Sequence, residues 1–345
     1  MTATPGRTMR ASVLRGVGDV VVEERPVPEP GPGQVVVRVA SVGVCGSDVH
    51  YYEHGRIGRY VVDSPLVLGH EAAGEVAAVG PGVTSPTVGQ RVSVEPGVPD
   101  LVCEQCLAGR YNLCPDMRFF ATPPIDGAFA EYVVVHAAFA HPVPDSITDD
   151  AAALLEPLSV GIWACRKGQV TAGSRVLITG AGPIGLVSVQ AAQAFGATDI
   201  VVSDVNPARL ALARDLGATE VVDARTASVR DLARPPSVLL ECSGHPAATV
   251  EGIRALGPAG RAVLVGMGGD ELSLPLSVLQ ERELEVTGTF RYAGTWPTAI
   301  ALVAAGRIDL DRLVTGTYAL GEAEAALTAG RRDPQSVKVV VHPQT

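Results

Sequence analysis

Long apolar runs, basic patches and a disulfide framework are all missing from this sequence of 345 residues. Because no stretch of about 18 or more apolar residues occurs, we expect no transmembrane helix. Acidic residues outnumber basic ones, 37 to 27, and the basic residues form no patch, so nucleic acid is not an expected partner. The stretch MTATPGRTMRAS lacks the continuous apolar core of a secretory signal, and we therefore expect a cytoplasmic protein.

The six cysteines, without a secretory signal, are more typical of reduced thiols than of disulfides. Three of them, Cys103, Cys106 and Cys114, fall within the segment PDLVCEQCLAGRYNLC, and Asp100 precedes the first by three residues. Thiolates and carboxylates are both ligands of zinc. The spacing alone leaves three alternatives: a zinc site with Asp100 as the fourth ligand, a disulfide remnant, or a decayed metal site.

The chain shows two successive patterns of predicted secondary structure. Up to about residue 155, short β-branched runs bounded by Gly and Pro predict strands at 33–44, 72–80, 89–97 and within 127–144. Strands then alternate with helices, which predicts a parallel, doubly wound sheet. Its expected strands are 174–182, 199–204, 220–223, 237–244, 260–269 and 284–290.

The last part of the chain is too short for a domain with a large core of its own. It ends in another β run, VKVVVHP. We therefore expect it to complete the first domain. The predicted domains are residues 1–157, 158–288 and 289–345, the last being the C-terminal part of the first.

A glycine-rich turn opens the predicted α/β unit. GAGPIG, residues 180–185, fits G-x-G-x-x-G between a strand and a helix, the context that dinucleotide binding requires. Gly180 permits the tight turn, Gly182 lets the backbone approach a pyrophosphate, and Gly185 allows close packing of helix on strand. The pyrophosphate would lie at the helix N-terminus. A plain glycine turn is the alternative.

Asp204 ends the next predicted strand, 19 residues after Gly185. A carboxylate there accepts hydrogen bonds from ribose hydroxyls and repels a 2′-phosphate, which favours NAD over NADP. Arg209 offers a partner for a 2′-phosphate, but beside Asp204 we expect it to pack on the adenine. The sequence thus predicts NAD as the cofactor.

Residues 42–76 and the stretch LLEPLSVG supply a second set of metal-binding candidates. Cys45 and His70 offer a thiolate and an imidazole, while Glu71 and Glu156 offer carboxylates. Taken singly, each fits a structural role better than a metal-binding one: a buried cysteine, a hydrogen-bonded histidine or a solvated glutamate. Together with the dinucleotide motif they predict metal-assisted hydride transfer, in which zinc polarises an alcohol oxygen.

The chain resembles the zinc-containing medium-chain dehydrogenases, and within them the sorbitol (polyol) dehydrogenases. The stretches that carry the resemblance are CGSDVHYYEHGRIG, VLGHEAAGEV, YNLCPDMRFFATPPIDGAFAEY, LLEPLSVG, GAGPIGL, VSDVNPARL and FRYAGTWP. They run nearly from end to end, and the first, third and last separate polyol from simple alcohol dehydrogenases. The resemblance implies an α/β protein with a GroES-like, β-rich catalytic domain and a doubly wound, parallel-sheet Rossmann domain.

The resemblance also implies a catalytic zinc on Cys45, His70 and Glu71. Glu156 lies where alcohol dehydrogenases have a second cysteine ligand, so whether Glu71 or Glu156 binds the metal directly stays open. The same family has a structural zinc lobe, whose four positions here are Asp100, Cys103, Cys106 and Cys114. Three thiolates at this spacing favour an occupied site.

Further roles follow from matching positions. Ser47 and His50 match a proton relay, with an ordinary loop histidine as the alternative for His50. The substrate-binding positions are Tyr51, Phe119, Glu156, Arg291 and Tyr292. The cofactor-binding positions, besides the three glycines, Asp204 and Arg209, are Pro183, Ile184, Val265, Gly266, Met267, Phe290 and Arg291. For Phe119, simple core packing is the alternative.

The resulting hypothesis is an NAD- and zinc-dependent enzyme that oxidises a secondary alcohol of a polyol, such as sorbitol or xylitol, to a ketose. Dehydrogenases of cyclitols, amino-polyols or sugars are alternatives within the enzymes. A non-catalytic NAD-binding scaffold is the alternative from another class. On resemblance alone we expect a homotetramer.

Overall fold

The computed structural model describes residues 8–345, which form two compact units. The first unit contains residues up to Glu156 together with Leu310–Thr345, and the second contains Pro157–Asp309. None of the helices within residues 8–345 combines the length and the apolar character needed to cross a membrane.

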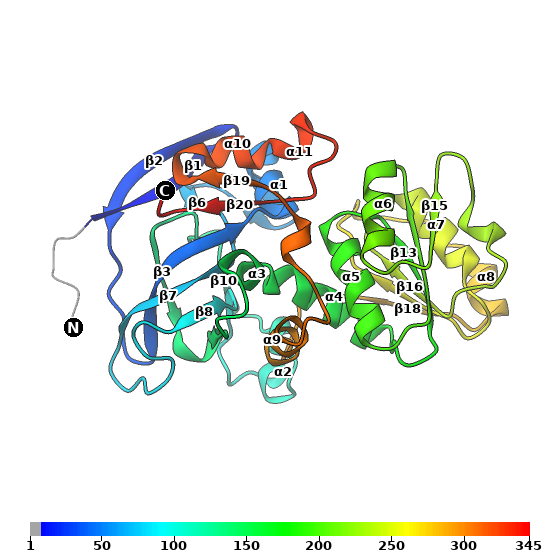
Figure 1. The fold of residues 1–345 in the computed structure, drawn as a ribbon, viewed down its shortest axis with the longest axis horizontal. Helices are drawn as coiled ribbons and strands as arrows, with labels where there is room; N and C mark the ends of the chain where they lie inside the picture. Colours follow the sequence, from blue (N-terminus) through cyan, green and yellow to red (C-terminus); the bar gives the residue numbers. More distant parts are fainter. Residues whose placement is uncertain (1–7) are drawn as a thin grey trace. The chain divides into compact units, whose positions relative to one another are not determined.

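The first unit is built on β-sheets (Figure 1). Its main sheet has the order β12-β8-β7-β3-β20-β19, with β11 also paired to β3, and a smaller sheet has the order β2-β1-β6. The strands of the main sheet are β3 (Gln34–Gly43), β7 (Glu71–Val79), β8 (Arg91–Val94), β11 (Tyr132–His136), β12 (Ala140–Pro142), β19 (Val314–Ala319) and β20 (Lys338–His342). The smaller sheet contains β1 (Thr8–Gly16), β2 (Asp19–Pro26) and β6 (Leu66–Val67).

Apolar side chains from the strands fill the core of this unit. Residues 35, 37 and 39 of β3 are fully buried valines, and Leu14, Leu68 and Phe129 pack into the same cluster. The remaining elements include β4 (Arg56–Ile57), β5 (Tyr60–Val61), β9 (Gly97–Val98), β10 (Arg118–Phe119), α1 (Gly46–His54), α2 (Glu104–Leu107), α3 (Asp149–Ala153), α10 (Ala323–Leu327) and α11 (Ala329–Arg332).

The C-terminal strand joins the sheet formed by the N-terminal part, as the sequence predicts. β20 pairs antiparallel with β3, where Val340 lies opposite Gly43, and β19 pairs with β20. In Figure 1 the red strand β20 belongs to the same body as the blue strand β3. The first and last parts of the chain therefore share one core.

The second unit is a parallel sheet of order β15-β14-β13-β16-β17-β18. Its strands are β13 (Arg175–Thr179), β14 (Asp199–Asp204), β15 (Glu220–Asp223), β16 (Val238–Glu241), β17 (Arg261–Leu264) and β18 (Glu285–Gly288). The helices α5 (Pro183–Ala194), α6 (Pro207–Asp215), α7 (Pro246–Ala255) and α8 (Leu276–Glu281) alternate with these strands along the chain; α5 packs on β13 and β14, and α7 packs on β13 and β16 (Figure 1). The predicted doubly wound Rossmann fold is confirmed.

The second unit continues beyond residue 288, where the sheet ends. The helix α9 (Trp296–Ala304) belongs to it, and the side chain of Trp296 is fully buried. Arg166, on α4 (Leu155–Lys167), donates to the carbonyl oxygen of Gly294 over 2.9 Å. The amide of Gln190 also exchanges two hydrogen bonds with the backbone of Asp309. Because of these contacts the second unit extends to Asp309. The domain boundary expected from the sequence lies earlier, at residue 288, directly after the last parallel strand.

Candidate metal centres and active site

Cys45 stands at the start of α1, and Asp48 holds it there. Cys45 is the N-cap of the helix, and its backbone N–H donates to the Asp48 carboxylate over 3.0 Å. This contact is half of a capping box, in which a side chain in the first turn satisfies an N–H that has no partner within the helix. The backbone of Cys45, from which the thiol projects, is therefore held by local structure.

The same carboxylate orients His70. Asp48 is fully buried, accepts the backbone N–H of Gly69 over 2.9 Å, and lies 3.6 Å from Nδ1 of His70. Burial would lower the pKa of the His70 imidazole, but the neighbouring Asp48 and Cys45 raise it well above its usual value. One buried side chain thus ties together two loops that lie far apart in the sequence.

Glu71 is the first residue of β7 and projects beside β3. It lies opposite Gly43, and a Cβ atom at position 43 would lie 2.0 Å from its Oε2 atom. The other oxygen, Oε1, accepts a hydrogen bond from the ammonium of Lys338, which is also buried. Burial would lower the pKa of Lys338, but Glu71 and, more weakly, Cys45 and Glu156 raise it, so that the lysine is a cation.

Cys45, His70 and Glu71 form a set of donors that fits a zinc ion. Each offers one ligand atom, and these atoms lie within 4.8 Å of one another. Oε2 of Glu71 is buried and has no hydrogen-bond partner among the described residues. A buried carboxylate oxygen without a donor is costly, and a metal ion would satisfy it. Sulfur, imidazole nitrogen and carboxylate oxygen are together a typical zinc donor set with room for a substrate oxygen.

Glu156 lies in the first turn of α4 and is 5% exposed. It is not a member of the group of donor atoms around Cys45. Between the two alternatives that the sequence leaves open, this geometry favours Glu71 as the direct ligand.

The cysteine-rich segment also forms a compact donor set. Ligand atoms of Asp100, Cys103, Cys106 and Cys114 lie within 4.8 Å of one another. The Asp100 carboxylate accepts the backbone N–H groups of Cys103 and Val102, each over 2.9 Å, and these bonds lower its pKa to about 2. Asp100 is therefore an anion that faces the thiols.

Among these thiols, Cys106 lies in surroundings that favour its neutral form. Burial, followed by hydrogen bonding with Cys103, raises the pKa of the Cys106 thiol to about 12. A divalent cation reverses such a shift because it binds the thiolate. Three sulfurs and one carboxylate oxygen fit a four-coordinate zinc site.

The predicted substrate residues are divided between the two units. Tyr51 is buried in the first, and the ring of Phe119 lies 5.6 Å from the ring of His70, centroid to centroid. In the second unit, the Arg291 guanidinium lies 4.8 Å from the centroid of the Phe290 ring, and Tyr292 is buried against Trp296. Arg291 has a φ of 54°, an uncommon conformation for a residue with a side chain, and such residues concentrate at functional sites.

The two residues of the predicted proton relay lie on α1. Ser47 is partly exposed in the first turn, and His50 is exposed. The His50 ring meets the ring of His54 edge-on at 4.6 Å. The relay stays a prediction.

The glycine-rich turn has the geometry that nucleotide binding requires. Gly180 has a φ of 89°, and a Cβ at Gly185 would lie 1.8 Å from the carbonyl oxygen of Gly180. A Cβ at Gly182 would meet no atom within 4 Å, so its free face is open to a ligand. Gly182 is also the N-cap of α5, where Pro183 occupies the first turn.

A cavity of about 510 Å³ lies beside this turn, at the carboxyl ends of the parallel strands. Its lining includes Gly180, Asp204, Ser243 and His245. The Asp204 carboxylate accepts the backbone N–H groups of Ala181, over 2.6 Å, and of Asn206, over 2.7 Å. The acidic group is thereby fixed at the rim of the nucleotide cavity.

The loops that follow β16 and β17 pack closely at the same edge. The backbone N–H groups of Val265 and Gly266 both donate to the carbonyl oxygen of Glu241 over 2.8 Å. A Cβ at Gly266 would lie 2.2 Å from the backbone nitrogen of Gly244. Met267, which follows, is 62% exposed.

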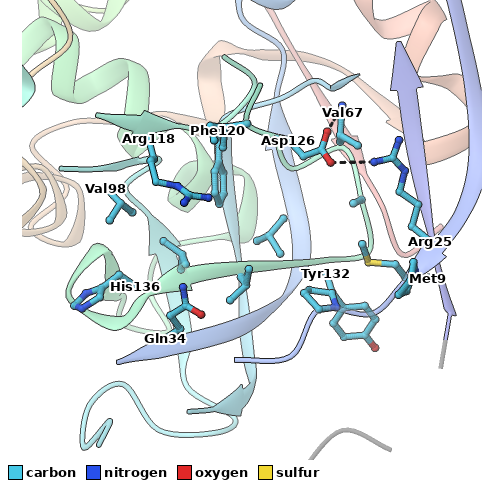
Figure 2. Close-up of a pocket in the computed structure, with 18 of the residues that line it drawn as sticks. Met9, Arg25, Gln34, Val67, Val98, Arg118, Phe120, Asp126, Tyr132 and His136 are labelled. Carbon is cyan, nitrogen blue, oxygen red and sulfur yellow. Dashed lines mark hydrogen bonds and ion pairs between the residues drawn. The ribbon is translucent and has the colours of Figure 1, made fainter. Parts of the chain in front are cut away.

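A larger cavity in the first unit, about 650 Å³, contains none of the predicted site residues. It runs along β11. Figure 2 shows Asp126 joined to Arg25 and Val67 at one end and Arg118 beside Phe120 at the other. The predicted site residues therefore lie outside this larger cavity.

Comparison with known proteins agrees with this arrangement. The family described as "Alcohol dehydrogenase GroES-like domain" matches residues 31–145, and the family described as "Zinc-binding dehydrogenase" matches residues 183–305. The chain therefore belongs to the zinc-binding alcohol dehydrogenases with a GroES-like domain and a Rossmann domain.

Among the individual proteins that this chain resembles are sorbitol dehydrogenases. The chain is 44% identical to the sorbitol dehydrogenase of Rattus norvegicus over 93% of this chain and 92% of that protein. It is 41% identical to the sorbitol dehydrogenase of Bacillus subtilis over 99% of both. Among solved structures, the L-idonate 5-dehydrogenase of Escherichia coli superposes with a TM-score of 0.92 at 31% identity, covering 99% of both chains.

Sequence reasoning missed two supporting residues. Asp48 follows Cys45 by three residues, the spacing of a capping box, which could have indicated its role. Lys338 is the one charge within the apolar run VKVVVHP, which could have marked it as paired. Their partners could not be found from the sequence, because they lie on other strands and loops.

Proposed function

We propose that this enzyme oxidises a secondary alcohol of a polyol of the sorbitol class to a ketose, with NAD as the hydride acceptor. The observation that carries the proposal is the group of Cys45, His70 and Glu71 within 4.8 Å, in a zinc-binding dehydrogenase fold. The sorbitol dehydrogenases of rat and Bacillus subtilis, similar over more than nine tenths of the chain, support the choice of substrate.

The residues of the first unit would activate the alcohol. Cys45, His70 and Glu71 would hold zinc, which supplies a Lewis acid that polarises the alcohol oxygen. Asp48 fixes the first two of these residues, while Phe119 lies against His70 and shapes the apolar side of the site. The hydroxyl proton would leave through Ser47 and His50 to solvent, and the hydride would leave from the carbon.

Hydroxyl groups along the polyol need donors and acceptors, because a buried hydrogen bond left unmade is costly. We propose Tyr51, Glu156, Arg291 and Tyr292 as the residues that supply them. Arg291 is suited to this role because its guanidinium is a fixed fork of donors.

The second unit would bind the cofactor. The N-terminus of α5 at Gly182 would bind the pyrophosphate, and Asp204 would accept the ribose hydroxyls and exclude a 2′-phosphate. Bound NAD supplies the acceptor for the hydride. Residues 265–267 and 290 would flank the cofactor, as the resemblance to the polyol dehydrogenases implies.

The structural lobe would hold a second zinc through Asp100, Cys103, Cys106 and Cys114. We further propose that the enzyme is a homotetramer, as the same resemblance implies, and that it acts in the cytoplasm, where its cysteines would stay reduced. Sedimentation of the purified protein would test the assembly. A monomer at micromolar concentration would contradict it.

The decisive experiment is a substrate panel with two matched cysteine variants. Sorbitol, xylitol, ribitol, L-arabinitol and inositols are tested with NAD and with NADP, and formation of the reduced cofactor is followed by absorbance. We expect activity with linear polyols and NAD, abolished in Cys45→Ser and retained in Cys165→Ala, whose buried thiol lies outside the donor sets. Activity with inositols alone would favour a cyclitol dehydrogenase, and activity retained in Cys45→Ser would rule out the zinc mechanism.

A further inference from the structure

We propose that Lys338 is a positioning residue of the catalytic metal centre, which binds one oxygen of Glu71 and so reserves the other oxygen for the metal. The inference rests on the proposed role of Glu71 as a metal ligand. It assigns a function to a side chain on the C-terminal strand that is far from all three ligands in the sequence.

The contacts of Lys338 reach two of the ligand positions at once. Its Nζ atom donates to Oε1 of Glu71 over 2.5 Å and to the carbonyl oxygen of Val44 over 2.7 Å. Val44 directly precedes Cys45. The lysine therefore binds the side chain of one ligand and the backbone next to another.

The two oxygens of Glu71 differ in their surroundings. Oε1 is bound by the lysine, whereas Oε2 is buried and has no hydrogen-bond partner among residues 8–345. Gly43 leaves the space that Oε2 occupies, since a Cβ there would lie 2.0 Å away. With Oε1 engaged, Glu71 offers the cation a single oxygen. Glu71, Gly43 and Lys338 lie on β7, β3 and β20, which are neighbours in this order in the main sheet.

The choice of lysine is unusual for this chain. Among its 27 basic residues, lysine occurs only at positions 167 and 338, and all the others are arginine. Lys338 is 3% exposed. A compact ammonium can point three donors at closely spaced acceptors, whereas a planar guanidinium needs more room.

The charge of Lys338 complements the same site. Its ammonium contacts the Glu71 carboxylate and the backbone carbonyl oxygen next to Cys45, so a positive charge lies beside two of the proposed ligands. Without the ammonium, Oε1 would lose its donor, and the carboxylate could turn and present both oxygens to the metal. Lys338 would then determine how Glu71 binds the metal as well as how strongly.

The test compares metal binding in Lys338→Met and Lys338→Gln with that in Lys167→Met, which removes the only other lysine. Zinc release to a chromophoric chelator is timed, and Co²⁺ is substituted for zinc so that its visible absorption reports the ligand geometry. Subtraction of the Cys45→Ser spectrum removes the contribution of the structural lobe.

We expect both Lys338 variants to release the Cys45-dependent zinc about 10- to 100-fold faster, the usual effect of losing a residue that orients a metal ligand. Their Co²⁺ spectra should change, while Lys167→Met should match the original protein. In a Glu71→Gln background the Lys338 substitution should have little further effect, because the lysine acts through Glu71.

The outcomes separate this inference from the proposed function. If the unsubstituted protein binds no Cys45-dependent metal, the proposed catalytic centre itself is wrong, and the inference with it. If that metal is bound but neither its release nor the Co²⁺ spectrum changes in the Lys338 variants, only the inference is wrong. If circular dichroism shows that neither variant folds, Lys338 is a structural residue of the sheet and the inference is also overturned.

Discussion

Removal of the Asp48 carboxylate should damage stability and metal retention together. Asp48 is fully buried and accepts the N–H groups of Cys45 and Gly69. In Asp48→Ala both donors lose their partner, and at about 1–3 kcal/mol for each, the free energy of unfolding should fall by about 2–6 kcal/mol. Asp48→Asn keeps the shape and one acceptor oxygen, so its loss should be about half as large.

The assay is urea unfolding of chelator-treated protein, followed by a separate measurement of zinc release from the loaded protein. Since Asp48 also lies beside Nδ1 of His70, both variants should release zinc about 10- to 100-fold faster. The matched control is Asp126→Ala. The Asp126 carboxylate accepts the N–H of Val67 over 2.8 Å and pairs with Arg25, without contact to a proposed ligand.

The control variant should lose some stability and keep its zinc. If Asp126→Ala releases zinc as fast as Asp48→Ala, the effect comes from loosening of the loop in general. In that case the reasoning about Asp48 is refuted. Equal stability of Asp48→Ala and the original protein would refute it as well.

Three further substitutions test separate parts of the account. Gly43→Ala should lower zinc occupancy at the catalytic centre at least tenfold, because its Cβ would displace the Glu71 carboxylate; metal analysis by mass spectrometry checks this. Asp100→Ala should reduce zinc from two to one per chain, since the fourth ligand of the lobe is lost, with polyol oxidation by the folded fraction retained. Asp204→Ala should lower the ratio of kcat/KM for NAD to that for NADP by about 10- to 100-fold, roughly 1.4–2.7 kcal/mol.

Each of these three has a contradicting result. Full zinc occupancy in Gly43→Ala would mean that Glu71 binds the metal from another direction or not at all. Two zinc ions per chain in Asp100→Ala would show that Asp100 is not a ligand. Unchanged cofactor selectivity in Asp204→Ala would show that another residue discriminates between NAD and NADP.

Much of the fold could be predicted from local patterns. Alternation of strand and helix from residue 174 indicated the parallel sheet, since runs such as Arg175–Thr179 are apolar on both faces of a strand buried in such a sheet. The return of the C-terminal strand also followed, because a short β run needs a sheet to join. The donor set around Cys103 was visible because its four residues lie within one loop.

The catalytic centre was harder to predict from the sequence, because its residues are brought together only by the strand topology. Cys45 and Glu71 belong to different strands and loops, and only the pairing of β7 with β3 brings them together. From residues alone each fitted a structural role better, and resemblance to a family supplied the assignment. The capping-box spacing of Asp48 behind Cys45 was visible in the sequence, but the contact of Asp48 with His70 and that of Lys338 with Glu71 were not, because tertiary structure sets both.

The expected domain boundary differs from the compact unit for a related reason. Sequence patterns follow strands, and the parallel sheet ends at Gly288. The segment beyond it is held to the second unit by side-chain contacts, among them the pair of hydrogen bonds between Gln190 and Asp309. Such side-chain contacts produce no periodic pattern in the sequence, so the extent of the second unit could not be predicted from it.

The most direct test of the central claim is a zinc titration of the metal-free enzyme, with sorbitol oxidation by NAD measured at each step. We expect the unsubstituted protein to bind two zinc ions per chain and to regain activity as they bind. Cys45→Ser should bind one zinc and stay inactive. Activity in the metal-free protein, or full activity in Cys45→Ser, would contradict the account.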